Sequence, residues 1–117
     1  MMSYILSGAA VADLRGIARY TRKQWGGAQA RHYRDKLEQG MARLAARQGP
    51  LKDMSAVYPA MGMAHCEHHY IFGLLRENAP ALIVAVFHER MDLLARLAER
   101  LGEPPGVTGI ELSPRGE

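Results

Sequence analysis

The stretch "YTRKQWGGAQARHY", residues 20–33, contains two consecutive glycines between two charged segments. Before the glycines, apolar residues recur at three- and four-residue steps from Val11 to Trp25, which is the period of an amphipathic helix. After them the same period resumes, with most of the charged residues on the opposite stripe. Because paired glycines end helices, the stretch predicts two helices, over residues 8–25 and 28–47, that fold back on each other as a hairpin.

Short segments flank the predicted hairpin on both sides. The apolar triplet "YIL", residues 4–6, is predicted as a first strand, and Ser7 as the N-cap of the first helix. The segment "QGPLKDMSAVYPAMGM", residues 48–63, carries two prolines and two glycines and has no helical period. We therefore expect a connection there, with a short edge strand late in it.

The C-terminal half changes from a strand pattern to a helix pattern. "AHCEHHYIFGLL", residues 64–75, and "ALIVAVFH", residues 81–88, are rich in β-branched and aromatic residues, and the turn "RENAP" separates them. They predict an antiparallel strand pair. Leucines at helical spacing predict a last helix over residues 91–101, which Gly102 and two prolines end. The order of strand, two helices, small antiparallel sheet and helix is that of an α+β fold.

Length and composition favour a single globular domain. With 117 residues, of which 48% are hydrophobic and 23% charged, the chain suits one core, and we expect the domain to span residues 1–101. Residues 102–117 have little apolar surface to bury and are expected to form a flexible tail. The longest apolar run, residues 81–87, is far shorter than the roughly 20 residues of a membrane span. The N-terminal residues lack the charged start of a secretory signal and Cys66 has no cysteine partner, so we expect a cytoplasmic protein without a membrane partner.

Positive charge is concentrated in the predicted hairpin. The whole chain has 15 Lys and Arg against 12 Asp and Glu, which gives a net charge of +3. Residues 15–47 hold nine Lys or Arg against two acidic residues, a local charge of about +7. Such a segment favours an acidic partner, which would be nucleic acid, an anionic surface or an acidic protein segment. The alternative is that these charges only solvate the outer faces of two amphipathic helices.

The run "HCEHH", which begins at His65, has the residue types of a metal site. In a continuous strand, alternation would place His65, Glu67 and His69 together on one face. Three such ligands suit zinc, but the sequence offers no evident fourth protein ligand except His88. Cys66 has no base beside it in the sequence that would make it a nucleophile. We therefore expect no metal site and no cofactor.

The run "FHERMD", residues 87–92, joins the last predicted strand to the last helix. Adjacent antiparallel strands would bring four polar residues together, namely His69, His88, Glu89 and Arg90. Histidine and carboxyl groups that move protons, together with a cation for the phosphate, are what cleavage of RNA through its 2′-hydroxyl needs. The alternative is that these side chains make polar contacts at the sheet edge and at the helix N-terminus. There the helix dipole favours Glu89 and Asp92 without any chemistry.

Several short motifs, in one order, resemble the ParE branch of the RelE/ParE superfamily, the toxins of bacterial type II toxin–antitoxin modules. The similarity covers residues 4–101, and its most specific part combines "YT", "WG" and "QA" in the hairpin with "FHERMD" near the end. The matching positions are Tyr4, Ser7, Ala10, Asp13, Leu14, Ile17, Tyr20, Thr21, Trp25, Gly26, Gln29, Ala30, Tyr33, Leu37, residues 69–72, residues 87–92, Arg96 and Leu97. The family fold, a small antiparallel sheet on a helical hairpin, agrees with the predicted order of elements.

The resemblance implies a toxin that poisons DNA gyrase and is not an enzyme in its own right. RelE-type toxins are instead ribosome-dependent mRNA endoribonucleases. His69 and Glu89 stand where two RelE arginines would be, and Ala95 stands where a RelE tyrosine would be, so the RNase set is not preserved. Two alternatives stay open. One is a RelE-type RNase that uses the four polar residues at the strand ends, and the other is a non-toxic homologue that only binds its antitoxin.

The resemblance also implies a partner, a ParD-like antitoxin whose flexible, acidic C-terminal segment lies along the hairpin and the sheet. The basic hairpin suits such a segment, because disordered acidic chains wrap large basic surfaces. The candidate antitoxin contacts are Arg15, Arg19, Arg22 and Arg31. The candidate target contacts are Arg90 and Arg96. DNA would be contacted mainly through the antitoxin.

Overall fold

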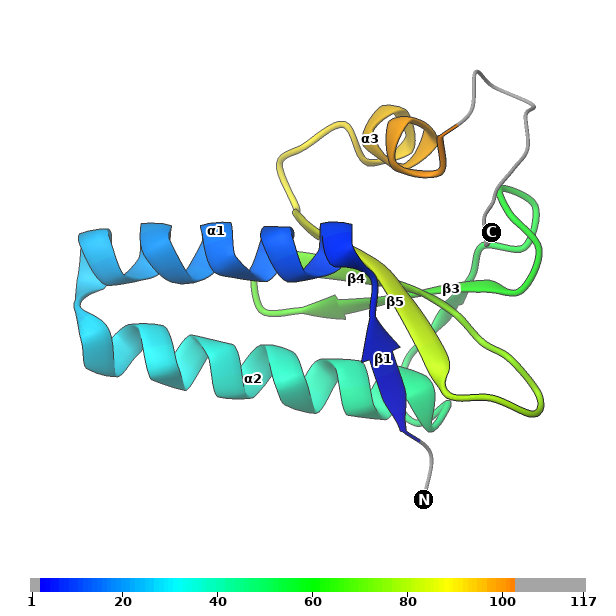
Figure 1. Ribbon diagram of the computed structural model, residues 1–117, viewed down its shortest axis with the longest axis horizontal. Coiled ribbons are helices and arrows are strands. Elements are labelled where there is room, and N and C mark those ends of the chain that lie inside the picture. The colour runs from blue at the N-terminus through cyan, green and yellow to red at the C-terminus, as the bar shows by residue number, and fades with distance from the viewer. Residues whose placement is uncertain (1–2, 103–117) are drawn as a thin grey trace.

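A computed structural model describes residues 3–102, in which two long helices lie against one five-stranded sheet (Figure 1). In chain order the elements are β1 (Tyr4–Leu6), α1 (Gly8–Trp25), α2 (Gly27–Ala45), β2 (Lys52–Asp53), β3 (Met61–Cys66), β4 (His69–Leu74), β5 (Ala81–His88) and α3 (Leu93–Arg100). The predicted α+β class and the order of its parts are confirmed.

The helical hairpin forms where the glycine pair predicts it. Ser7 caps α1, since its Oγ accepts a hydrogen bond from the Ala10 N–H at 3.0 Å. Gly26 has a φ of 95°, a conformation that glycine adopts without strain, and it both ends α1 and caps α2. The two helices run side by side and extend beyond the sheet at the end where Gly26 joins them (Figure 1). The end of α2 at Ala45 falls two residues before the predicted one.

The sheet has the order β1-β5-β4-β3-β2, and it is mixed rather than wholly antiparallel. β1 pairs in parallel with β5, with Tyr4 opposite Ala81, whereas the other neighbours are antiparallel. The predicted edge strand exists as the two-residue β2, but it lies early in the connection, because the end of that connection from Met61 already belongs to β3.

The prediction of a single strand over residues 64–75 is wrong. The chain turns at Glu67, which has a φ of 56°, and β3 and β4 form a tight hairpin in which Cys66 pairs with His69. Because paired residues share a face, His69 lies on the same face as Cys66, and His65 lies on the opposite one. The hypothesis of a metal site in "HCEHH" assumed instead that His65 and His69 share a face. Among residues 3–102 no cluster of His, Cys, Asp and Glu has the geometry to hold a metal ion.

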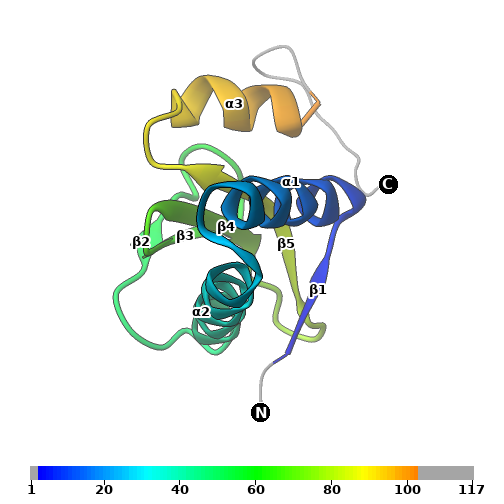
Figure 2. The ribbon, with the colours of Figure 1, turned by 90° about the vertical axis from the view of Figure 1, so that its left-hand side faces the viewer.

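Apolar side chains cover both faces of the sheet. The face under α1 and α2 is built around Leu37, Leu44 and Ile71, all almost fully buried. The other face is built around Phe72 and Leu97, the latter from α3. Viewed from the Gly26 end, α3 lies above α1, on the side away from α2 (Figure 2). α3 begins at Leu93 rather than at residue 91, because Asp92 is its N-cap, as its hydrogen bond from the Ala95 N–H shows.

Two further expectations concern the C-terminal tail and membrane-spanning helices. Of the predicted flexible tail, only Gly102 is described, so the remainder of that expectation lies outside residues 3–102. In the described part of the chain, no helix combines the length and the apolar character that crossing a bilayer requires.

Candidate functional site

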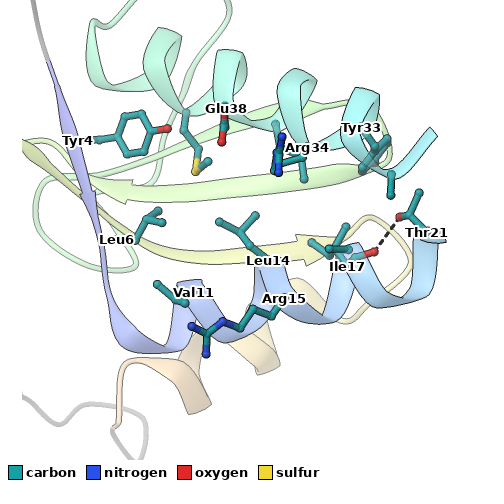
Figure 3. A pocket seen from close by; sticks show the side chains of 14 residues that line it. Tyr4, Leu6, Val11, Leu14, Arg15, Ile17, Thr21, Tyr33, Arg34 and Glu38 are labelled. Atoms are coloured by element: carbon teal, nitrogen blue, oxygen red, sulfur yellow. Dashed lines mark hydrogen bonds between the residues drawn. The ribbon is translucent and has the colours of Figure 1, made fainter. Parts of the chain in front are cut away.

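A narrow apolar groove with a volume of about 240 Å³ runs between α1 and α2, and we call it the hairpin groove (Figure 3). Its lining consists of Tyr4, Leu6, Val11, Leu14, Arg15, Ile17, Ala18, Thr21, Ala30, Tyr33, Arg34, Leu37, Glu38 and Met41. β1 closes one end of it through Tyr4 and Leu6 (Figure 3). Ala18 and Ala30 contribute only a methyl group each, and so they leave part of the space between the helices unfilled. The groove offers apolar surface to a partner segment.

Arginines border the hairpin groove on both sides. Arg15 comes from α1 and Arg34 from α2 (Figure 3). Of the four predicted antitoxin contacts, Arg15 alone lines the groove, and Arg19 and Arg22 follow it at helical spacing on α1. Arg31 lies in α2 next to Gly27. All four are exposed, and within residues 3–102 none of them forms an ion pair.

Tyr4 and Glu38 add polar groups at the lining of the hairpin groove. Burial, reinforced by the Glu38 carboxylate, raises the pKa of the Tyr4 hydroxyl above its usual value. The hydroxyl therefore stays protonated at neutral pH and is a hydrogen-bond donor. From the sequence, Tyr4 was predicted only as part of the first strand, with no role in a site.

A second and larger groove, of about 640 Å³, lies where the overhanging end of the helical hairpin meets the ends of β4 and β5. We call it the histidine groove, and its lining is Gly16, Ile17, Tyr20, Thr21, Trp25, Gln29, Tyr33, Glu67, His68, His69, His88 and Arg90. The register explains the meeting of two of the histidines, because His69 of β4 pairs with His88 of β5 and their rings lie edge to face at 5.2 Å. The two strands thus bring together His69, His88 and Arg90, as predicted.

Tyr33 fixes the tautomer of the His69 ring. The Tyr33 hydroxyl accepts a hydrogen bond from the His68 backbone N–H at 3.0 Å and lies 2.7 Å from Nδ1 of His69. We assign the hydroxyl proton to this second contact, since the oxygen then both accepts and donates. The proton of the neutral His69 ring consequently lies on Nε2. Burial, with His88 and His68 adding to it, lowers the pKa of His69 to about 4, so the ring is uncharged at neutral pH.

The family model described as the ParE toxin of the type II toxin–antitoxin system parDE matches residues 4–93. The chain belongs to the ParE toxin family. The toxin ParE of Escherichia coli is 64% identical over 101 residues, which cover 86% of this chain and 98% of that protein. The resemblance to the ParE branch is thereby confirmed.

The fold is also similar to that of a chain in a solved structure. A chain described as the chromosomal ParDE TA system from P. aeruginosa superposes with a TM-score of 0.59 over 75% of this chain and 96% of its own length. Its sequence identity is 18%, so this similarity supports the fold alone.

In this ParE-family chain Glu89 does not join the other predicted RNase candidates. Its carboxylate instead accepts hydrogen bonds from His65 Nε2 at 3.0 Å and from His68 Nδ1 at 3.1 Å. Hydrogen bonds from His68 and His65 lower the pKa of Glu89. The Glu89 N–H also donates to the His68 carbonyl. Glu89 thus ties the β3–β4 turn to the end of β5, and of the two acids assigned to the helix N-terminus only Asp92 caps α3.

The two predicted target contacts of this ParE-family chain lie in different places. Arg90 lines the histidine groove, whereas Arg96 lies on α3, 3.6 Å from Glu99. The ion pair between Arg100 and Asp13 was not predicted from the sequence. The sequence held one signal of such a pair. Asp13 lies directly before Leu14 of the apolar stripe of α1, where an unpaired acid would be costly, and this position predicts a cationic partner.

Proposed function

We propose that this chain is the toxin of a type II module, that it inhibits growth by poisoning DNA gyrase, and that a ParD-like antitoxin neutralises it. We further propose that it acts in the cytoplasm and contacts the DNA of its operon mainly through the antitoxin. Membership in the ParE toxin family supports the first part. The observation that carries the partner assignment is the apolar hairpin groove with the exposed arginines Arg15 and Arg34 at its border.

The hairpin groove suits the acidic C-terminal segment proposed for the antitoxin. Apolar side chains of that segment would be buried against the groove, and its carboxylates would meet Arg15 and Arg34 at the border. Arg19, Arg22 and Arg31 would extend the positive field along the helices, which speeds the encounter of oppositely charged chains. A segment that orders on binding loses conformational entropy, so burial in the groove has to supply most of the affinity.

The histidine groove supports a toxin that binds its target without cleaving RNA. A general base needs a free lone pair within reach of the hydroxyl that it deprotonates. Nδ1 of His69 already accepts from Tyr33, and Nδ1 of His88 already accepts from the Arg90 N–H at 3.0 Å. The Glu89 carboxylate is bound by His65 and His68. His69 and His88 therefore present N–H donors to the groove, and a RelE-type mechanism that uses His69, His88 or Glu89 as its base would need these bonds to break first.

Expression of the chain in a bacterium without any antitoxin tests this proposal. Gyrase poisoning predicts filamentous cells, a DNA-damage response and gyrase–DNA cleavage complexes, all abolished by co-expression of the antitoxin. Prompt arrest of translation with cut mRNA would favour the RelE-type alternative. Normal growth with a stable antitoxin complex would favour the non-toxic homologue.

A further inference from the structure

Two aromatic side chains of the histidine groove are unusually exposed. Tyr20 and Trp25 have 65% and 71% of their surface open to solvent. Both lie on the part of α1 near Gly26, where the helical hairpin extends beyond the sheet (Figure 1). Large aromatic side chains in a concave site are typical of surfaces that bind a partner, because their flat faces supply contact area at little cost in side-chain entropy.

Three polar side chains of the histidine groove, His69, His88 and Arg90, present hydrogen-bond donors. Since Nδ1 of His69 and Nδ1 of His88 both accept hydrogen bonds, each ring carries an N–H on Nε2. His69 is 8% exposed, and within the described residues its Nε2 has no hydrogen-bond partner. Arg90 adds a guanidinium that forms no ion pair within residues 3–102, and Gln29 adds an amide. Among residues 3–102, Glu67 is the one carboxylate in the lining. A donor-rich site of this kind suits an anionic group.

Positive charge is concentrated at the same end of the helical hairpin as the histidine groove. Arg19, Arg22 and Lys23 lie on the last turns of α1, and Arg31 lies on the first turns of α2. All four are exposed and form no ion pairs in the described part of the chain. Cations that track a backbone, next to aromatic rings that stack on bases, are the combination that binds single-stranded nucleic acid.

We propose that the histidine groove binds a segment of single-stranded nucleic acid. A base stacks on Trp25 or Tyr20, and an adjacent phosphate accepts hydrogen bonds from Arg90 and from the imidazole N–H groups. The groove volume of about 640 Å³ is of the size of a small-molecule site, which is enough for one nucleotide unit, with the neighbouring phosphates on the arginines outside. This inference does not rest on the gyrase proposal, and it adds a ligand class that neither the family description nor the relatives name.

The test is a binding titration of the full chain with a dye-labelled single strand of DNA. A length of roughly ten nucleotides is within the site sizes of such grooves. Fluorescence anisotropy reports binding, and quenching of Trp25, which is the single tryptophan of the chain, reports its place. We expect saturable binding with Trp25 quenching. We also expect a loss of affinity of about fivefold or more in Trp25→Leu and in Arg90→Gln, because stacking and phosphate contacts are each of that size.

Arg43→Gln is the matched control, since Arg43 is an exposed arginine of α2 outside the histidine groove and carries the same charge. It should bind the strand within about twofold of the unaltered chain. A second control is a strand of equal length without bases, which should bind at least about fivefold more weakly. Circular dichroism of each variant shows whether it is folded.

Three results would overturn the inference. The first is the absence of binding by the unaltered chain. The second is an equal loss of affinity in Arg43→Gln and Arg90→Gln, or equal binding of the strand without bases, since either would mean diffuse attraction to the basic hairpin. The third is competition by an acidic peptide at lower concentration than by the DNA strand, since the groove would then hold carboxylates. None of these outcomes bears on the hairpin groove, because Trp25 and Arg90 do not line it.

Discussion

Arg100 of α3 and Asp13 of α1 form a two-point ion pair, with Nη1 at 2.7 Å from Oδ2 and Nη2 at 2.9 Å from Oδ1. The same carboxylate accepts a hydrogen bond from the Val86 N–H, and the same guanidinium donates to the Val84 carbonyl. The guanidinium also lies 5.0 Å from the centre of the Phe87 ring. This pair therefore joins α3, α1 and β5, three elements that meet nowhere else through charged groups in residues 3–102.

Asp13→Ala is expected to destabilise the protein by roughly 3 kcal/mol, because it leaves the Arg100 guanidinium largely buried without its partner. The side chains of Arg100 and Asp13 are 23% and 16% exposed, so water screens the pair only in part. Urea unfolding measures the change. The double variant Asp13→Ala/Arg100→Met should lose less stability than the two single variants together. Strict additivity would mean that the two residues are not coupled.

Gly40→Ala is expected to destabilise the protein. Overpacking of the core should cost roughly 1–3 kcal/mol, and the higher helix propensity of alanine should offset about 1 kcal/mol of that cost. A methyl group at this position would meet Cys66 Sγ at 2.8 Å and Ile71 Cδ1 at 3.0 Å, where α2 packs on the sheet. Gly16→Ala in α1 is the matched control, because its nearest atom is the end of the flexible Arg19 side chain at 3.9 Å. The control should be neutral or stabilising. A stabilising Gly40→Ala would contradict the packing described here.

The free energy of unfolding should fall as the pH is lowered from about 6.5 towards 4. The reason is that the pKa of His69 is about 4 in the folded protein, whereas the usual His value is about 6.5. The folded state keeps His69 neutral while the unfolded state binds a proton. The contribution is therefore complete above about pH 6.5 and is lost as pH falls towards 4. The loss between about pH 7 and about pH 5 should be roughly 2 kcal/mol.

The non-titrating variant His69→Asn isolates this effect. Its urea midpoint should change less between the two pH values than that of the unaltered chain. The lowered pKa of Glu89 adds loss of stability in the same direction, but at lower pH, where that carboxylate takes up its proton. An identical pH dependence in His69→Asn and the unaltered chain would show that His69 is not the buried neutral group.

Reversal of charge beside the hairpin groove should weaken antitoxin binding. Arg15→Glu and Arg34→Glu are each expected to lower the affinity for the acidic antitoxin segment about tenfold, and to reduce its dependence on salt, because each removes a nearby cation and adds repulsion. Calorimetry at two salt concentrations measures both. Arg43 lies in α2, as Arg34 does, but outside the hairpin groove, so Arg43→Glu should have a much smaller effect on the affinity. Equal losses in all three variants would place the antitoxin elsewhere.

The sequence predicted the helical hairpin well because two independent signals agreed. The 3.6-residue period marked both helices, and Gly26 supplied the positive φ that their junction needs. The β3–β4 turn was missed because "HCEHHYIF" contains no glycine, proline or asparagine, and Glu67 adopts the left-handed conformation that those signals usually mark. This one turn decided which face His69 occupies.

The candidate sites were predicted only in part. Charge counting found Arg15, but the apolar lining of the hairpin groove could not be separated from the core, because Leu14 and Ile17 belong to the same helical stripe as fully buried Ala10. Tyr33 could not be connected to His69 before the register of β3 and β4 was known, since the two residues are 36 positions apart in the chain.

We proposed that this ParE-family chain poisons DNA gyrase, and the decisive test is a cleavage assay with purified components. The chain is incubated with gyrase, ATP and supercoiled plasmid, and the reaction is stopped with detergent and protease. Gyrase poisoning predicts linear plasmid DNA that increases with the amount of toxin and disappears when antitoxin is added first. Unimpaired supercoiling without linear DNA, at a molar excess of a folded toxin that still arrests growth, would contradict it.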